Sequence, residues 1–161
     1  MRLTKTTFMI VCLGLVFAGA VQAQQRSKRQ MPKTQQPQVE YISSPRPRPA
    51  PFSDAVRVDN ILYLSGKLGT DSSGRLVPGG IQAETKQTLE NIRGLLERSG
   101  SSLDQVVKCT VMLADMSEWG AMNEVYVTFF AADRRPARSA FGTNGLALNA
   151  RVEIECIAAI K

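Results

Sequence analysis

Residues 151–160 read RVEIECIAAI and have the clearest strand pattern in this chain. Apolar or small side chains recur at every second position from Val152 to Ile160. Glu153 and Glu155 occupy positions between them. A period of two is the repeat of a β-strand, whose successive side chains lie on opposite faces of a sheet. We therefore predict a strand with one face in the core and a second, more polar face.

Two amphipathic helices and five further strands are predicted on the N-terminal side of this strand. Apolar residues fall at helical spacing over residues 81–99, and Gly100 follows as a typical C-terminal stop. Asp115 with Glu118 three positions later resembles a capping box, which predicts a second helix to about residue 132. The predicted buried residues are Ile81, Thr85, Leu89, Ile92, Leu95 and Leu96 in the first helix, and Trp119, Met122, Tyr126, Phe129 and Phe130 in the second. Glu84, Lys86, Glu90, Arg93 and Glu97 are expected away from that face. The further strands are predicted at residues 39–42, 55–58, 61–65, 106–113 and 138–143.

The predicted order β-β-β-α-β-α-β-β indicates an α+β fold. Strands grouped around two helices favour one mixed sheet with both helices on a single face, a two-layer sandwich. The other face of the sheet would then be open and semi-polar, which is a natural surface for contact with another copy of the chain.

The composition excludes several kinds of chemistry. The 161 residues contain no His, which removes the commonest general base and a common metal ligand, and makes a Ser-His-Asp triad impossible. There is no Cys-x-x-Cys, and Gly66-x-x-Gly69 is too short for a phosphate loop. No metal or nucleotide motif is present, so chemistry has to come from carboxylates, Arg, Lys, Tyr, Ser, Cys or backbone amides.

The first 23 residues have the pattern of a secretory signal peptide. Arg2 and Lys5 precede an apolar run over residues 8–21, and Val21-Gln22-Ala23 follows with small residues at the cleavage positions. The run is short for a bilayer, which takes about 20 residues. We expect cleavage after Ala23 and export to the periplasm or the medium; the alternative is a retained N-terminal anchor.

The net charge of +6 comes from the N-terminal part of the chain. Residues 24–37 (QQRSKRQMPKTQQP) contain basic residues and no acidic ones, whereas residues 38–161 carry equal numbers of both. We expect residues 24–37 to be a disordered, solvated linker; the alternative is contact with an anionic surface such as lipid, peptidoglycan or nucleic acid. The neutral domain at residues 38–161 lacks the basic surface of a specific nucleic-acid binder.

Cys109 and Cys156 both fall in predicted strands. Export permits a disulfide, but the sequence does not identify the partners. We expect two buried free thiols, and neither has a neighbouring His that would make it a nucleophile.

Arg138 is the leading candidate for binding a small acid. It lies in Pro136-Ala137-Arg138-Ser139, between the second helix and a short strand. A guanidinium group offers two parallel donors to a planar carboxylate. The alternative is a surface charge or a structural salt bridge.

Several stretches of the chain, in the same order, resemble the Rid (reactive intermediate deaminase) family, also called the YjgF-type or endoribonuclease L-PSP family. The resemblance runs from about residue 38 to residue 161. The matching stretches are PFSDAV (51–56), LYLSG (62–66), QTLENI (87–92), VKCTV (107–111), MNEVY (122–126), FF (129–130), PARS (136–139) and VEIE (152–155). Each stretch alone is a weak match to the family, but six or more in register make a specific match.

The resemblance implies a chorismate-mutase-like fold and a homotrimer whose sheets form a central barrel, with ligand sites between subunits. It implies hydrolysis of 2-imino or 2-enamino acids to 2-keto acids and ammonia, without a cofactor. Arg138 matches the arginine that binds the substrate carboxylate, and Glu153 matches the carboxylate that orients the attacking water. Ser65 and Gly66 match residues that line the pocket.

Three departures from the family pattern bear on substrate preference. Phe52 stands where the family has a pocket tyrosine, and Ala140 stands at a position that is often Cys. Leu146-Ala147 replaces the usual Leu-Pro. Two other functions are alternatives: a non-catalytic trimer that binds a small carboxylate or keto acid, and an RNA-cleaving translation inhibitor.

Overall fold

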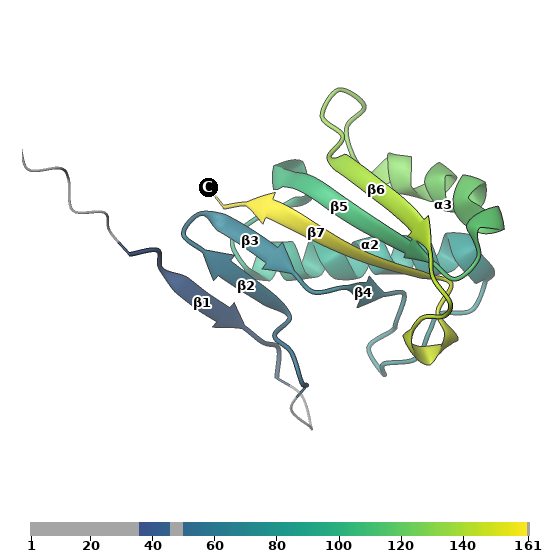
Figure 1. The fold of residues 1–161 in the computed structure, drawn as a ribbon, viewed down its shortest axis with the longest axis horizontal. Coiled ribbons are helices and arrows are strands. Elements are labelled where there is room, and N and C mark those ends of the chain that lie inside the picture. Colours follow the sequence, from purple (N-terminus) through teal and green to yellow (C-terminus); the bar gives the residue numbers. More distant parts are fainter. Residues whose placement is uncertain (1–35, 46–49, 161) are drawn as a thin grey trace, which may run out of the picture. The chain divides into compact units, whose positions relative to one another are not determined.

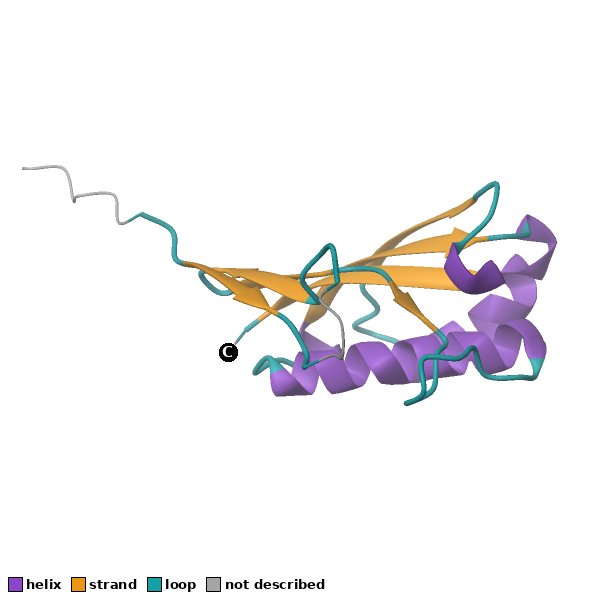
Figure 2. Cartoon of the chain, turned by 90° about the horizontal axis from the view of Figure 1, so that it is seen from below, coloured by secondary structure: helices purple, strands orange, loops and turns teal. Residues whose placement is uncertain are grey.

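The computed structural model of the protein describes residues 36–45 and 50–160. Within these residues, a mixed sheet forms one layer and two helices pack on one face of it, as Figure 2 shows. The helices are α2 (Gly80–Arg98) and α3 (Trp119–Tyr126). The strands are β1 (Val39–Ile42), β2 (Ala55–Val58), β3 (Ile61–Leu64), β4 (Lys67–Leu68), β5 (Val106–Leu113), β6 (Ala137–Gly142) and β7 (Val152–Ala159). Short 3₁₀ turns span Leu103–Gln105, Met116–Glu118, Val127–Phe129 and Ala147–Asn149. The predicted α+β two-layer sandwich is confirmed.

Strand β7 lies in the middle of the sheet (Figure 1). The strand order is β1-β2-β3-β7-β5-β6, and β4 pairs with β7 beyond the end of β3. Strands β5 and β6 are parallel, and the other neighbouring pairs are antiparallel. Val152, Ile154, Cys156 and Ala158 are at most 2% exposed, as the alternation in β7 predicts.

Helix α2 buries the predicted apolar face against the sheet. Glu84, which was expected away from that face, is only 6% exposed, so this prediction was wrong. Its carboxylate accepts a hydrogen bond of 2.8 Å from the backbone N–H of Arg151, which satisfies the buried charge. Gly69 lies so close to α2 that an added Cβ would be 2.6 Å from the carbonyl oxygen of Glu84. Glycine at this position therefore allows the chain after β4 to pack against the helix.

Helix α3 is shorter than predicted. Asp115 caps the 3₁₀ turn Met116–Glu118, which leads directly into α3, by accepting a hydrogen bond of 2.8 Å from the N–H of Ser117. Glu118 does not complete the capping box, because its carboxylate pairs with Arg151. The α-helix has only eight residues, and Met122 and Tyr126 are its buried positions. Trp119 is 45% exposed, contrary to the prediction that it lies in the core.

Cys109 and Cys156 form a disulfide between β5 and β7, so the expectation of two free thiols was wrong. The two residues are direct partners in the antiparallel register, and their Cα atoms are 4.1 Å apart. Directly opposed residues on adjacent strands point to the same face, which brings the two sulfur atoms together. The sequence does not reveal this register.

No helix in the described ranges is long and apolar enough to cross a membrane. The predicted signal peptide (residues 1–23) and most of the predicted basic linker (residues 24–35) lie outside the described residues.

Candidate functional site

Arg138 lies on β6 with its side chain on the helix-facing side of the sheet. Its partner in the β5–β6 register is the buried Cys109, and paired residues share a face. The guanidinium carbon lies 4.5 Å from the centre of the Tyr126 ring on α3. Among the described residues, the Arg138 side chain has no ion pair and no hydrogen bond. Its donors are therefore available to a ligand.

The ring of Tyr126 packs against the guanidinium group of Arg138. The ring is 3% exposed and packs against Phe130 at a centroid distance of 4.9 Å. Burial raises the pKa of Tyr126 to about 12, although the nearby Arg138 charge acts in the opposite direction. The ring is therefore neutral at ordinary pH and offers its face to the cation. We call Arg138, Tyr126 and Ala140 the arginine half-site, because Ala140 lies two positions along β6 on the same face.

Glu153 lies on the opposite face of the sheet. It alternates along β7 with the buried Val152 and Ile154, and its β4 partner is Leu68. A Cβ atom added to Gly66 would overlap the Glu153 carboxylate, so glycine makes room for that group. Burial raises the pKa of Glu153, and the negative charge of Glu155 raises it further. Within the described chain, the Glu153 carboxylate has no ion pair or hydrogen bond, which leaves it free to bind water.

Hydrogen bonds between the chain before β2 and the end of β3 hold Ser65 beside Gly66. The Ser65 hydroxyl donates to the carbonyl oxygen of Ser53 at 2.7 Å, and its N–H donates to the carbonyl oxygen of Asp54 at 3.0 Å. Phe52 immediately precedes this segment and is 55% exposed. We call Phe52, Ser65, Gly66 and Glu153 the carboxylate half-site.

One copy of the chain does not bring the two half-sites together. Arg138 lies on the helix-facing side of the sheet, whereas Glu153 lies on the open side.

Tyr126 was predicted only as a core residue, and nothing in its sequence context pointed to Arg138. Asp54 and Lys67 were not singled out from the sequence. The available signal was an acidic residue directly before an apolar strand, and the structure shows that Asp54 is buried there.

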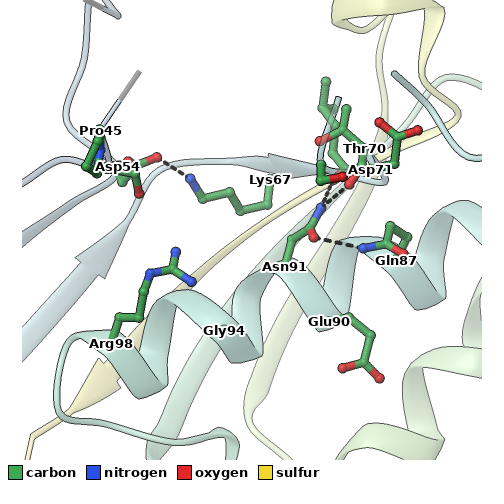
Figure 3. Close-up of a pocket in the computed structure, with 13 residues that line it drawn as sticks. Pro45, Asp54, Lys67, Thr70, Asp71, Gln87, Glu90, Asn91, Gly94 and Arg98 are labelled. Carbon is green, nitrogen blue, oxygen red and sulfur yellow. Dashed lines mark hydrogen bonds and ion pairs between the residues drawn. The ribbon is translucent and has the colours of Figure 1, made fainter. Parts of the chain in front are cut away.

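A pocket beside α2 contains none of the predicted site residues. It has a volume of about 600 Å³ and lies between β4 and α2, where Figure 3 shows Lys67, Asn91 and Arg98 around it. A smaller pocket of about 190 Å³ lies on the open face of the sheet and is lined by Tyr63, Lys108 and Glu155, among others. In residues 36–45 and 50–160, no cluster of three or more His, Cys, Asp or Glu side chains could hold a metal ion.

Comparison with known proteins gives consistent matches. The sequence profile of the endoribonuclease L-PSP family matches residues 42–160. The 2-iminobutanoate/2-iminopropanoate deaminase of Mus musculus is 49% identical over 109 residues, which cover 67% of this chain and 80% of that protein. The Homo sapiens protein of the same name is 43% identical over 109 residues, which cover 67% and 79%.

Solved structures match in the same way. Yeast Mmf1 is 35% identical with a TM-score of 0.71, over 77% of this chain and 100% of that one. RidA from an Antarctic Psychrobacter is 36% identical with a TM-score of 0.66, over 78% and 99%.

Proposed function

Because this chain belongs to the endoribonuclease L-PSP (Rid) family, we propose that it hydrolyses 2-imino and 2-enamino acids to 2-keto acids and ammonia without a cofactor. The names of the mouse and human relatives support this reaction, since both describe deaminases of short 2-imino acids.

The observation that carries the proposal is the state of Arg138. Its guanidinium lies on a neutral aromatic ring and has no anionic partner among the described residues. A partly buried arginine without a carboxylate is costly unless a ligand supplies one. The carboxylate of an imino acid fits this role, because it accepts two parallel N–H donors.

Glu153 has the properties of a group that orients water. In the proposed reaction it accepts a hydrogen bond from a water molecule and directs that molecule at the imine carbon. The water oxygen forms a bond to the imine carbon while one water proton passes to nitrogen, which gives a carbinolamine. The hydroxyl proton of this carbinolamine then passes to nitrogen as the carbon–nitrogen bond breaks, which leaves the 2-keto acid and ammonia. Arg138 stabilises the adjacent carboxylate throughout. Imines hydrolyse readily in water, so accurate positioning of one water molecule can be sufficient.

We propose that the complete site forms between two copies in a homotrimer, with Arg138 from one copy and Glu153 from its neighbour. The placement of the two half-sites on opposite faces supports this arrangement. Large apolar side chains on the open face also support it: Tyr41 is 73% exposed, Tyr63 47% and Phe141 46%. Exposed apolar surface of this kind is typical of contact faces between copies.

The direct test is ammonia release from imines that an amino-acid oxidase produces from several amino acids. Acceleration above the uncatalysed rate supports the enzyme. Binding of 2-keto acids with no acceleration for any imine would contradict it and favour the non-catalytic trimer.

The rate of this reaction should depend on the charge of Glu155. Glu153 acts as a carboxylate, so activity should fall as the pH drops through its raised pKa. In Glu155→Gln the neighbouring negative charge is absent, which lowers the pKa of Glu153. The acid limb of kcat/KM against pH should therefore move to lower pH. An unchanged limb, or one at higher pH, would contradict the role of Glu153.

We also propose that the protein is exported and that its mature form begins with the basic linker at residue 24. The disulfide between Cys109 and Cys156 supports export, because such bonds persist in oxidising compartments. N-terminal sequencing after expression in a bacterium should give Gln24 as the first residue. Recovery of an intact Met1 terminus would contradict cleavage.

A further inference from the structure

A buried ion pair joins the chain before β2 to β4. The Lys67 ammonium group lies 2.6 Å from one carboxylate oxygen of Asp54, and the N–H of Ser44 donates to the other at 2.7 Å. The side chain of Asp54 is 2% exposed and that of Lys67 is 18% exposed. Figure 3 shows Lys67 extending from β4 toward Asp54 along the edge of the pocket.

This ion pair lies directly beside the carboxylate half-site. Lys67 follows Gly66, which contacts Glu153, and Asp54 accepts the N–H of Ser65 through its backbone carbonyl. The two backbone segments that carry Phe52 and Ser65 are therefore joined by the main-chain hydrogen bond from Ser65 to Asp54, by the Ser65 hydroxyl and by the Asp54–Lys67 side chains.

Strand β4 depends on such side-chain contacts because it is only two residues long. It pairs with β7 through Lys67 opposite Ile154 and Leu68 opposite Glu153. At its far end, the Asn91 amide donates to the carbonyl oxygens of Leu68 and Thr70, both at 2.9 Å (Figure 3). Lys67 holds the near end. The position of the backbone beside Glu153 therefore depends on both contacts.

We propose that Asp54 and Lys67 are positioning residues, which hold Ser65 and Gly66 against Glu153 so that the water on Glu153 is correctly aimed. This inference rests on the proposed imine hydrolysis. Neither residue touches the substrate: both side chains lie on the helix-facing side of β4, since Lys67 pairs with the buried Ile154. A buried ion pair contributes little net stability compared with apolar residues of similar volume. In this proposal, the role of the Asp54–Lys67 pair is to fix the geometry of the two segments that it joins.

The charge of Asp54 supports a positioning role over the whole pH range in which Glu153 is ionised. Burial raises the pKa of Asp54, but hydrogen bonds from Lys67 and Ser44 outweigh this and hold the pKa well below its usual range. Asp54 is therefore ionised wherever Glu153 is.

The test compares Lys67→Met, Asp54→Asn and the double variant Asp54→Asn/Lys67→Gln in the full-length protein. Both single variants should lower kcat for imine hydrolysis about 10- to 100-fold, because a displacement of about 1 Å can cost that much. KM should change by less than about threefold, since Arg138 still binds the carboxylate. The double variant restores a neutral hydrogen bond and should recover most of kcat.

Glu90→Gln is the matched control, because it removes an ion pair of the same length, 2.6 Å, between Glu90 and Arg93 on the partly exposed side of α2. It should leave kcat and KM unchanged. Wild-type kcat in both folded single variants would overturn the proposal. The proposal would also be overturned if the double variant lost as much kcat as the single variants, because restoring the contact would then not restore activity.

Amide hydrogen exchange at Ser65 and Gly66 separates this inference from the proposed function. Lys67→Met should speed exchange at Ser65, whose N–H donates to Asp54, even if the wild type hydrolyses no imine. An inactive wild type with faster Ser65 exchange in the variant would refute the reaction and leave the structural link standing. Unchanged exchange would overturn the link itself.

Discussion

Arg138→Ala is expected to lower kcat/KM for 2-imino acids by about 10²- to 10³-fold, because it removes two charge-assisted hydrogen bonds to the substrate carboxylate. The kcat/KM of Arg138→Lys should lie between that of the wild type and that of Arg138→Ala, since an ammonium group keeps the charge but lacks the planar pair of donors. Ammonia release with oxidase-generated imines, corrected for uncatalysed hydrolysis, measures both. Fold and stability should change little, because Arg138 has no carboxylate partner in the described chain.

Arg134→Ala is the control for this experiment. Arg134 lies four positions earlier and makes an exposed ion pair with Asp104 at 3.8 Å, so its loss should leave kcat/KM unchanged. Full activity in Arg138→Ala would contradict the carboxylate-binding role and favour the reading of Arg138 as a structural charge.

Mixed trimers test whether Arg138 and Glu153 act across a subunit boundary. Arg138→Ala and Glu153→Gln are each expected to be inactive as pure trimers. After the two variants are unfolded and refolded together in equal amounts, about one quarter of the sites should combine wild-type Arg138 from one copy with wild-type Glu153 from its neighbour. Activity near that fraction of wild type is expected. No recovery in trimers proven to be mixed would contradict the shared site.

Removal of the disulfide by Cys109→Ala/Cys156→Ala should lower the free energy of unfolding by about 4 kcal/mol, because the bond closes a loop with a sequence separation of 47 residues. Tm should fall by about 10–20 °C for a domain of this size. Urea and thermal unfolding at one fixed protein concentration measure the change, since assembly makes stability depend on concentration.

Reductant provides the internal control for the disulfide prediction. Reductant should lower the free energy of unfolding of the wild type to about the value of the double variant, and it should not change that of the double variant. Two reactive thiols in the unfolded wild type without reductant would contradict the disulfide and restore the sequence-based expectation. Cys109 is the β-sheet neighbour of Arg138, so imine hydrolysis in the reduced protein at low temperature also shows whether the bond supports the site.

Local patterns were sufficient for most of the secondary structure. The strands at residues 39–42, 55–58 and 106–113 have the predicted bounds, because alternation and turn residues act within a few positions. Strand β4 was missed, since two residues show no period. The interpretation of Glu84 as exposed failed because the helical pattern does not reveal that the N–H of Arg151 would satisfy a buried carboxylate.

The amino-acid sequence alone was enough to predict the α+β architecture, the family, and the identity of Arg138 and Glu153 as candidate residues. Tertiary structure decided which residues meet. It paired Cys109 with Cys156, placed Tyr126 under Arg138, joined Asp54 to Lys67, and put the two half-sites on opposite faces. The physical reason is that these contacts depend on strand register and on packing between distant segments. Periodicity along the chain reports which face a residue occupies, but it does not report what that residue faces.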